Sequence, residues 1–474
     1  MPENSAGSTS LRRSIGPSGF FTIAFGSVVG SGWVIVLGEW LRAAGPGGSI
    51  VGFALGGAVM ILVATCYGEL AARLPRAGGE FVYALNILGP GYAFALAWFL
   101  TLFFAAFMAF EGIALGWIVG TLLPQAQGPV LYSVLGFPVT VGALSLGLLF
   151  SAVFALLNYV GTRAAISFQR IVTFGFIALV IGLVVLAVCL GSPANARPFF
   201  PSDTGRHWEI GAFWVFSSTA VFLNGFQSAA YAIEERTRST SVGAVVVAMI
   251  LGVVAAVIFY CSIIYAVSGA TPWRDTVAAN LPAAFAFGKL TSSGILGRIV
   301  LIGAAFSLLK SWNAYVLSAA RLVFALAREG YLPAALARVH PRFGTPSNAI
   351  LAMLLLNVIG VACGRRAIVP IVDMSAICTT CCFVICLIAL LKVRRNGAIY
   401  AGFRVPGGAP IIYLALAGVI VMAVVAVYQP SAHTASGIPV EWVLLITWSL
   451  LGIAAWLKTR AIIGSRVQSS ARTE

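Results

Sequence analysis

The sequence predicts an all-α membrane protein with twelve transmembrane helices, of which the first and the sixth are broken. Of its 474 residues, 60% are hydrophobic and only 9% are charged, and the mean hydropathy is +0.99. A soluble globular domain carries about 25% charged residues, so this composition excludes that class. Twelve apolar runs are long enough to cross a bilayer. Glycines interrupt the first run, and an Asn-Gly pair interrupts the sixth.

Short polar or glycine-rich loops separate the apolar runs. We expect an outer turn at 44–48 and a charged inner loop at 67–80, which contains a proline and a Gly-Gly pair. The runs cover residues 15–41, 49–72, 91–123, 138–160, 166–190, 210–233, 243–268, 294–327, 347–363, 367–391, 411–428 and 440–457.

The first run contains Gly30-Ser31-Gly32 in its middle. Glycine weakens a helix, and the freed backbone groups are tolerated in a membrane only where protein or a water-filled cavity surrounds them. An unwound segment here would leave the N–H groups and positive dipole end of the second half-helix free to bind a carboxylate. The alternative is that the glycines only allow a neighbouring helix to pack closely.

A second break at Asn224-Gly225 favours the first interpretation, because it lies five runs after the first break. We therefore expect two inverted halves of five helices each, with no residue-level repeat between them. The expected units are a tail at 1–14, the first half at 15–191, the second half at 208–393, and two extra helices with a tail at 394–474.

Basic residues indicate how the chain is oriented. The net charge is +15, and of the 29 basic residues one, Lys310, lies within a run and eight fall on the side opposite the termini: Arg42, Arg197, Arg206, Arg274, Lys289, Arg298, Arg365 and Arg366. The positive-inside rule then places the protein in a cell membrane with both termini in the cytoplasm. This explains the charge without nucleic acid. No cleavage site follows the first run, so we expect that run to be retained rather than removed as a signal peptide.

Metal, cofactor and enzyme chemistry find no support in the sequence. Cys378 and Cys381 lie in an apolar run without histidine or carboxylate neighbours, so we interpret them as packed, reduced thiols. The three histidines lie in loops, and the loops are too short for a catalytic domain. A channel would be expected to show repeated pore motifs rather than two unlike breaks.

Five motifs occur in an order and at a spacing that resemble those of the amino acid–polyamine–organocation transporters, which include the amino acid permeases. The resemblance spans nearly the whole chain and implies the five-plus-five inverted-repeat fold, with helices one and six broken at the substrate site. The motifs are Gly30-Ser31-Gly32, Tyr67-Gly68-Glu69-Leu70 with 75–80, Gly225-Phe226-Gln227 through Glu235, Arg321 with 327–333, and 403–408.

The chain departs from this family at two positions that bear on energy coupling. Gln227 replaces the family's acidic residue in helix six, and Phe176 stands where proton-coupled members carry a lysine in helix five. Lys310 and Glu111 are the clearest remaining charges inside the membrane, and isolated charges there need partners or water. Lys310 is either a coupling residue at the cation position of sodium-coupled relatives or a structural lysine satisfied by carbonyls or by Asp373.

Glu111 has two interpretations as well. It either senses a cationic substrate or carries a proton, or it is a buried acid hydrogen-bonded between helices. The coupling candidates are therefore Lys310, Glu111 and Gln227.

We interpret the chain as a secondary active permease that moves amino acids by alternating access, with proton coupling. An amino acid/polyamine exchanger and a non-transporting nutrient sensor remain the alternatives. The substrate carboxylate is expected at the N–H groups of the first break, and its ammonium at carbonyls freed by both breaks. The expected substrate-binding residues are Val28, Gly30, Ser31, Gly32, Trp33, Val221, Phe222, Asn224, Gly225 and Tyr315. Partners are a small-molecule substrate and the lipid bilayer; the sequence does not indicate an oligomeric state.

Overall fold

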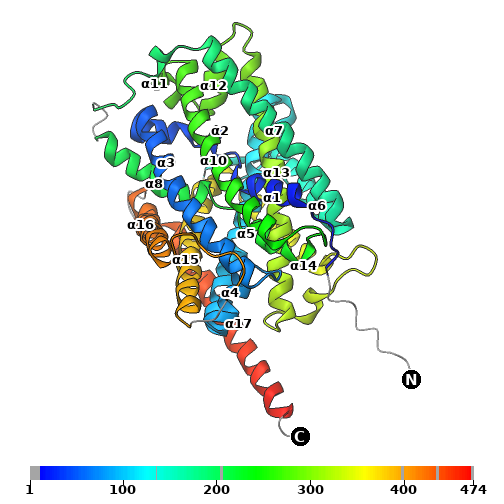
Figure 1. Cartoon of the computed structure of the whole chain (residues 1–474). Coiled ribbons are helices and arrows are strands. Elements are labelled where there is room, and N and C mark those ends of the chain that lie inside the picture. The colour runs from blue at the N-terminus through cyan, green and yellow to red at the C-terminus, as the bar shows by residue number, and fades with distance from the viewer. Residues whose placement is uncertain (1–10, 135, 203–206, 397–399, 434–436, 471–474) are drawn as a thin grey trace.

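The computed structural model describes residues 11–134, 136–202, 207–396, 400–433 and 437–470 (Figure 1). The tail expected at 1–14 is therefore described only from residue 11, and the last four residues of the expected C-terminal tail also lie outside the described part. Within that part, ten helical segments are long and apolar enough to span a membrane.

Helices account for nearly all of the regular structure. The α-helices are α1 (Pro17–Val28), α2 (Gly32–Ile35), α3 (Leu37–Arg73), α4 (Glu80–Ile87), α5 (Pro90–Leu122), α6 (Val141–Val160), α7 (Thr162–Leu190), α8 (Trp208–Phe222), α9 (Ser228–Tyr231), α10 (Val242–Ala270), α11 (Trp273–Val277), α12 (Pro282–Lys289), α13 (Ile295–Arg328), α14 (Ser347–Val361), α15 (Ile368–Arg395), α16 (Ala409–His433) and α17 (Val440–Ser470). Two strands, β1 (Val130–Val134) and β2 (Phe137–Thr140), pair antiparallel.

Both expected helix breaks are present. The first helix is interrupted between α1 and α2, and the sixth between α8 and α9. The two breaks touch, because a Cβ added to Gly225 would lie 2.7 Å from the backbone carbon of Ser27. Gly225 also has a φ of +120°, which a side chain would strain. Glycine is therefore required where the two broken helices meet.

Ten of the twelve predicted spans correspond to helical segments of the described residues that are long and apolar enough to cross a membrane. The two that fall short are the sixth, which the break divides into α8 and α9, and α14, which has only 15 residues. The first two spans are not separated by a loop: α3 continues through the expected outer turn and reverses at Gly45, where φ is +65°.

One short hairpin and several short helices were not expected in this otherwise helical chain. The β1–β2 hairpin replaces the start of the run expected at 138, so α6 begins only at Val141. Helices α4, α11 and α12 have eight residues or fewer and lie in segments interpreted as loops. Such short helices depend on tertiary packing more than on their own sequence.

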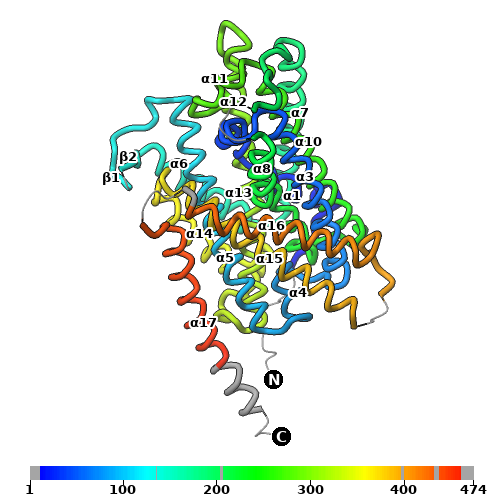
Figure 2. Tube along the Cα trace, turned by 90° about the vertical axis from the view of Figure 1, so that its left-hand side faces the viewer, coloured from blue at the N-terminus to red at the C-terminus, as the bar shows by residue number. Residues whose placement is uncertain are grey.

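The bundle is built around α5 and α13, which pack against each other. Helix α1 lies against α7, α10 and α13, while α3 packs on α8 and α10. Helices α16 and α17 run over the surface of the bundle, and the hairpin projects at its edge (Figure 2). Helix α4 and the pair α11–α12 lie at opposite ends of the molecule (Figure 1), in agreement with their assignment to opposite sides of the membrane.

A chain of buried amides fixes the first half-helix to its neighbours. Gln169 donates to the carbonyl of Thr22 at 3.0 Å and accepts from Asn313 at 2.8 Å, and Asn158 donates to Asn313 at 2.9 Å. All four residues are buried. Since unpaired polar groups are costly away from water, this chain links α1, α7, α13 and α6 in one arrangement.

A buried ion pair closes the bundle below the break in helix six. Arg321 donates to the two carboxylate oxygens of Glu235 at 2.7 and 3.1 Å, and Thr162 donates to the same carboxylate at 2.5 Å. Both charged side chains are fully buried. The N–H of Ile15 also donates to the Glu235 carbonyl at 2.9 Å, so the segment before α1 joins this contact.

We predict that Arg321→Ala lowers the free energy of unfolding by about 3–5 kcal/mol, because it leaves the Glu235 carboxylate buried without its cation. Thermal unfolding of the detergent-solubilised protein measures this. The control is Arg76→Ala, which removes the half-exposed pair with Glu329 and is expected to cost about 0–1 kcal/mol. Equal melting temperatures for the two variants would contradict the prediction.

Candidate functional site

Side chains of α13 satisfy the backbone carbonyls that the first break releases. The ammonium of Lys310 donates to the carbonyls of Gly26, at 3.2 Å, and of Val29. Ser307 donates to the carbonyls of Val29 and Gly30 at 3.0 and 2.9 Å. The Tyr315 hydroxyl donates to the Ser27 carbonyl at 2.9 Å. One face of α13 thus takes the place of the hydrogen bonds that a continuous helix would make.

The Lys310 ammonium is fully buried and lies over two aromatic rings. Its nitrogen is 4.8 Å from the ring centre of Phe176 and 5.6 Å from that of Phe25. Phe176 is the position at which the family resemblance led us to look for a lysine. The Lys310 ammonium of α13 therefore lies beside this position of the fifth span.

Glu111 faces the same break from α5. Its Oε1 accepts a hydrogen bond from Ser311 at 2.5 Å and lies 3.5 Å from the position of a Cβ on Gly30. Its Oε2 is buried and has no hydrogen-bond partner among the described residues. Glu111 also interacts electrostatically with Lys310. A carboxylate oxygen is thus available beside the unwound backbone.

The N-terminal side of the second half-helix carries polar groups without protein partners. The Ser31 hydroxyl and the Trp33 indole nitrogen are buried and unpaired within the described part of the chain. The Phe222 ring covers Gly32, since a Cβ there would lie 2.5 Å from it. Trp33 is enclosed by Phe176 and Phe259, with ring centres 6.1 and 5.9 Å away. The first break therefore presents unpaired donors next to an aromatic wall.

The second break is held by its own side chains. Gln227 donates to the Asn224 side-chain oxygen at 2.5 Å and accepts from the Gly225 N–H at 3.0 Å. The Val221 carbonyl accepts from the Asn224 N–H at 3.2 Å, so the expectation that this carbonyl is unpaired was wrong. No described donor reaches the carbonyls of Val28 or Asn224. The unwound segment is short enough to form a turn, which captures one of the two expected carbonyls.

The structure brings together all of the expected binding and coupling residues around the two breaks, from α1, α2, α5, α8, α13 and the unwound segments. Sequence reasoning missed Ser307 and Ser311. Ser307 lies three residues before Lys310, and Ser311 lies one residue after it. This spacing places all three side chains on one face of a helix, and the pattern was a usable signal.

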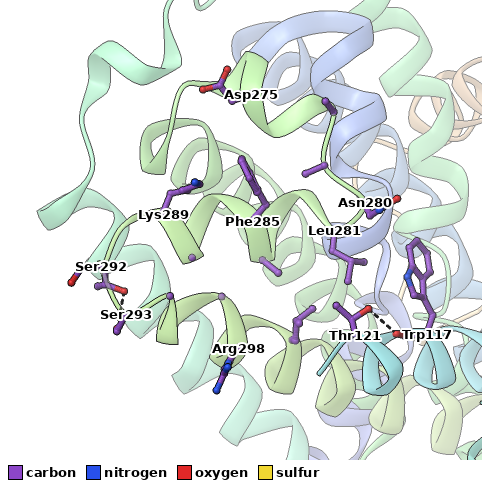
Figure 3. Close-up of a pocket in the computed structure, with 18 residues that line it drawn as sticks. Trp117, Thr121, Asp275, Asn280, Leu281, Phe285, Lys289, Ser292, Ser293 and Arg298 are labelled. Atoms are coloured by element: carbon purple, nitrogen blue, oxygen red, sulfur yellow. Dashed lines mark hydrogen bonds between the residues drawn. The ribbon is translucent and has the colours of Figure 1, made fainter. Parts of the chain in front are cut away.

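A cavity of about 1090 Å³ lies away from the breaks, between the end of α5, the α11–α12 segment and the start of α13 (Figure 3). Trp117, Asp275, Lys289 and Arg298 are among its lining residues. None of the expected site residues lines it. Among the described residues no group of three histidine, cysteine or acidic side chains is placed to hold a metal, and the cysteines are free thiols.

Curated proteins similar to this chain are transporters. The methylthioribose transporter of Bacillus subtilis is 25% identical over 87% of this chain and 88% of its own length. The branched-chain amino acid permease BcaP of the same organism is 24% identical over 85% of each chain. The human Asc-type amino acid transporter 1 is 26% identical over 85% of this chain and 76% of its own.

A family model described as amino acid permease matches residues 15–451, which include both broken helices and every residue of the site. The protein is a multi-pass membrane transporter rather than an enzyme. The chain belongs to the amino acid permease family, as the motifs around its two breaks indicate.

Proposed function

We propose that the protein is a proton-coupled amino acid permease of the cell membrane that works by alternating access. The observation that carries the proposal is the Lys310 ammonium bound to carbonyls of the first break, with Glu111 opposite it. A titratable cation in contact with the backbone of the substrate site links a proton to the conformation of that site. Membership of the amino acid permease family supports the substrate class.

The substrate is placed across the two breaks. Its carboxylate meets the N–H groups of Ser31, Gly32 and Trp33, where the first N–H groups of a helix lack intrahelical acceptors. Its ammonium meets the carbonyls of Val28 and Asn224, which no described donor occupies. Phe222 lies over Gly32 and contacts the bound substrate.

The coupling of proton movement to substrate movement follows from the hydrogen bonds that Lys310 donates to the first break. A protonated Lys310 holds the carbonyls of Gly26 and Val29 and keeps α1 against α13. Loss of the proton removes the charge from these hydrogen bonds, which weakens them and loosens α1, and this lets the site open to the other side. Both termini face the cytoplasm, in accordance with the distribution of basic residues.

Proteoliposome experiments separate this proposal from exchange. Purified protein is reconstituted, and radiolabelled amino acids are offered under an imposed pH gradient, an imposed sodium gradient, or no gradient. Accumulation under the pH gradient alone supports proton symport. Uptake that requires amino acid inside the vesicle indicates an exchanger instead, and no uptake under any condition indicates a sensor.

We predict that Gly32→Val abolishes transport. A branched side chain would collide with Phe222 and would keep the substrate carboxylate from the backbone N–H groups. Loss of one charge-assisted contact worth about 1.4 kcal/mol or more corresponds to at least a tenfold fall in affinity. Initial uptake rates measure this, with immunoblots of membranes to check insertion. Gly175→Val is the matched control, because a Cβ at Gly175 meets nothing within 4 Å. Normal uptake in Gly32→Val would refute the binding assignment.

We predict that Lys310→Ala and Lys310→Arg both lose proton-driven accumulation. Alanine removes the titrating group, and a guanidinium does not deprotonate in proteins. The backbone substrate site remains, so counterflow exchange should survive in part. Accumulation and counterflow are compared in the same proteoliposome preparations. If either variant still concentrates substrate under a pH gradient alone, Lys310 is structural and Glu111 becomes the coupling candidate.

We predict that Glu111→Gln lowers the affinity for cationic amino acids more than for neutral ones. Its Oε1 lies beside the unwound Gly30 and its Oε2 is unpaired. An amide at this place attracts a second positive charge less than a carboxylate does. Competition of unlabelled cationic and neutral amino acids against one labelled substrate gives the affinity ratio. An unchanged ratio would assign Glu111 to proton transfer or to structure.

A further inference from the structure

A second buried carboxyl lies outside the substrate site, at the start of α4. Glu80 is 1% exposed, and neither of its carboxylate oxygens has a hydrogen-bond partner among the described residues. A buried polar group without a partner is costly, and a charged one more so. Glu80 therefore either carries a proton in this conformation or is hydrated in place.

The surroundings of Glu80 are polar and equally unsatisfied. The hydroxyls of Tyr67, Tyr83 and Tyr231 are buried and make no hydrogen bond of normal geometry among the described residues, although the Tyr231 hydroxyl is close enough to Glu80 to interact with its carboxyl. All three interact electrostatically with Glu80, as do Cys382 and Cys386. These groups come from α3, α4, α9 and α15. No titratable side chain of α5 or α13, which also pack against α4, interacts with Glu80 in the described residues.

The backbone before α4 holds Glu80 beneath the broken sixth helix. Gly78 and Gly79 both have positive φ, of +110° and +49°. A Cβ on Gly79 would lie 3.2 Å from the Tyr231 ring of α9, and one on Gly78 would lie 2.6 Å from the Cβ of Ala325 in α13. This turn sets Glu80 directly against the second half of helix six, which begins after the break.

Aromatic contacts connect this place to the substrate site. The Tyr231 ring lies 5.5 Å from Phe104, and Phe104 lies 6.3 Å from Tyr315, which binds the Ser27 carbonyl of the first break. On another side, Tyr67 lies 5.5 Å from Phe226 in the second break. Packed side chains transmit displacements. A movement of α9 therefore shifts the side chains around the two breaks and also uncovers Glu80, against which α9 lies.

We propose that the Glu80 carboxyl is a second proton-binding site, which takes up a proton while α9 covers it and releases that proton to water when α9 moves away. The proton forms an O–H bond to one carboxylate oxygen and leaves as hydronium, so no other reactant is needed. The proposal rests on the proton coupling proposed above and adds a second place for the proton, at the start of α4.

The acidity of the group fits this role. Burial raises the pKa of the Glu80 carboxyl to about 7, and the neighbouring Tyr231 hydroxyl offsets only part of that rise. The side chain of Arg76, four residues before Glu80, is 45% exposed, so solvent reaches the segment that leads into α4. A carboxyl with this pKa binds and releases protons over the neutral range, which a normal glutamate does not.

The first test is the isosteric variant Glu80→Gln in proteoliposomes. We expect it to lose accumulation driven by a pH gradient and to keep counterflow exchange. Glu329→Gln is the matched control, because this carboxylate is partly exposed and paired with Arg76, and it should accumulate substrate like the wild type. Wild-type accumulation in Glu80→Gln would overturn the proposal.

Stability against pH gives a readout that needs no transport. The folded protein holds a proton on Glu80 that the unfolded chain releases above about pH 4.5. The resulting stabilisation is present below that pH and is lost as the pH rises through about 7. The wild-type melting temperature should therefore fall relative to that of Glu80→Gln over this range. A constant difference between the two would show that Glu80 does not titrate there, and would overturn the proposal.

Tyr231→Phe covers the case in which Glu80→Gln does not fold. It removes a hydroxyl that lowers the Glu80 pKa, so the pH dependence of stability should move to higher pH. An unmoved profile would overturn the proposal. If instead the wild type accumulates nothing under a pH gradient, the proposed coupling fails, and the stability profiles still decide whether Glu80 binds a proton.

Discussion

The backbone of the first break depends on donors that come from another helix. A membrane offers no water to the carbonyls that a helix break releases, so a transporter that unwinds a helix must supply protein donors for them. Here Lys310, Ser307 and Tyr315 supply them from one face of α13. This constraint fixes the distance between α1 and α13, and through the amide chain from Thr22 to Asn158 it fixes α6 and α7 as well. The rest of the bundle is arranged around this contact.

The two breaks differ in how they are stabilised. The first relies on side chains more than 270 residues away in the sequence, whereas the second is closed by Gln227 and Asn224 within its own turn. A segment held by remote donors changes when the donor helix moves or loses a proton. A segment held by local donors keeps its shape and moves as a unit. The first break is therefore the more responsive of the two.

The sequence was sufficient to locate both breaks, because glycine and Asn-Gly pairs act locally and apolar length is a direct requirement of the bilayer. Lys310 and Glu111 could be singled out, since a charge inside a span is rare. Their partners could not, because the carbonyls of Gly26 and Val29 become available only in the folded chain. The Val221 carbonyl was misjudged for the same reason, since a tight turn pairs it again. The β1–β2 hairpin and α4 carry too few residues for a periodic signal.

The buried pair of Glu235 and Arg321 has a consequence for how the protein is made. The two residues lie 86 positions apart, and α10 to α13 are synthesised between them. At about 5–20 residues per second, the carboxylate precedes its guanidinium by roughly 4–17 s during translation. Until then, burial of the Glu235 carboxylate without its cation is costly, which disfavours packing of this end of the sixth helix into the bundle. Closure of this end is thus a late step of biogenesis, timed by the emergence of α13 from the ribosome.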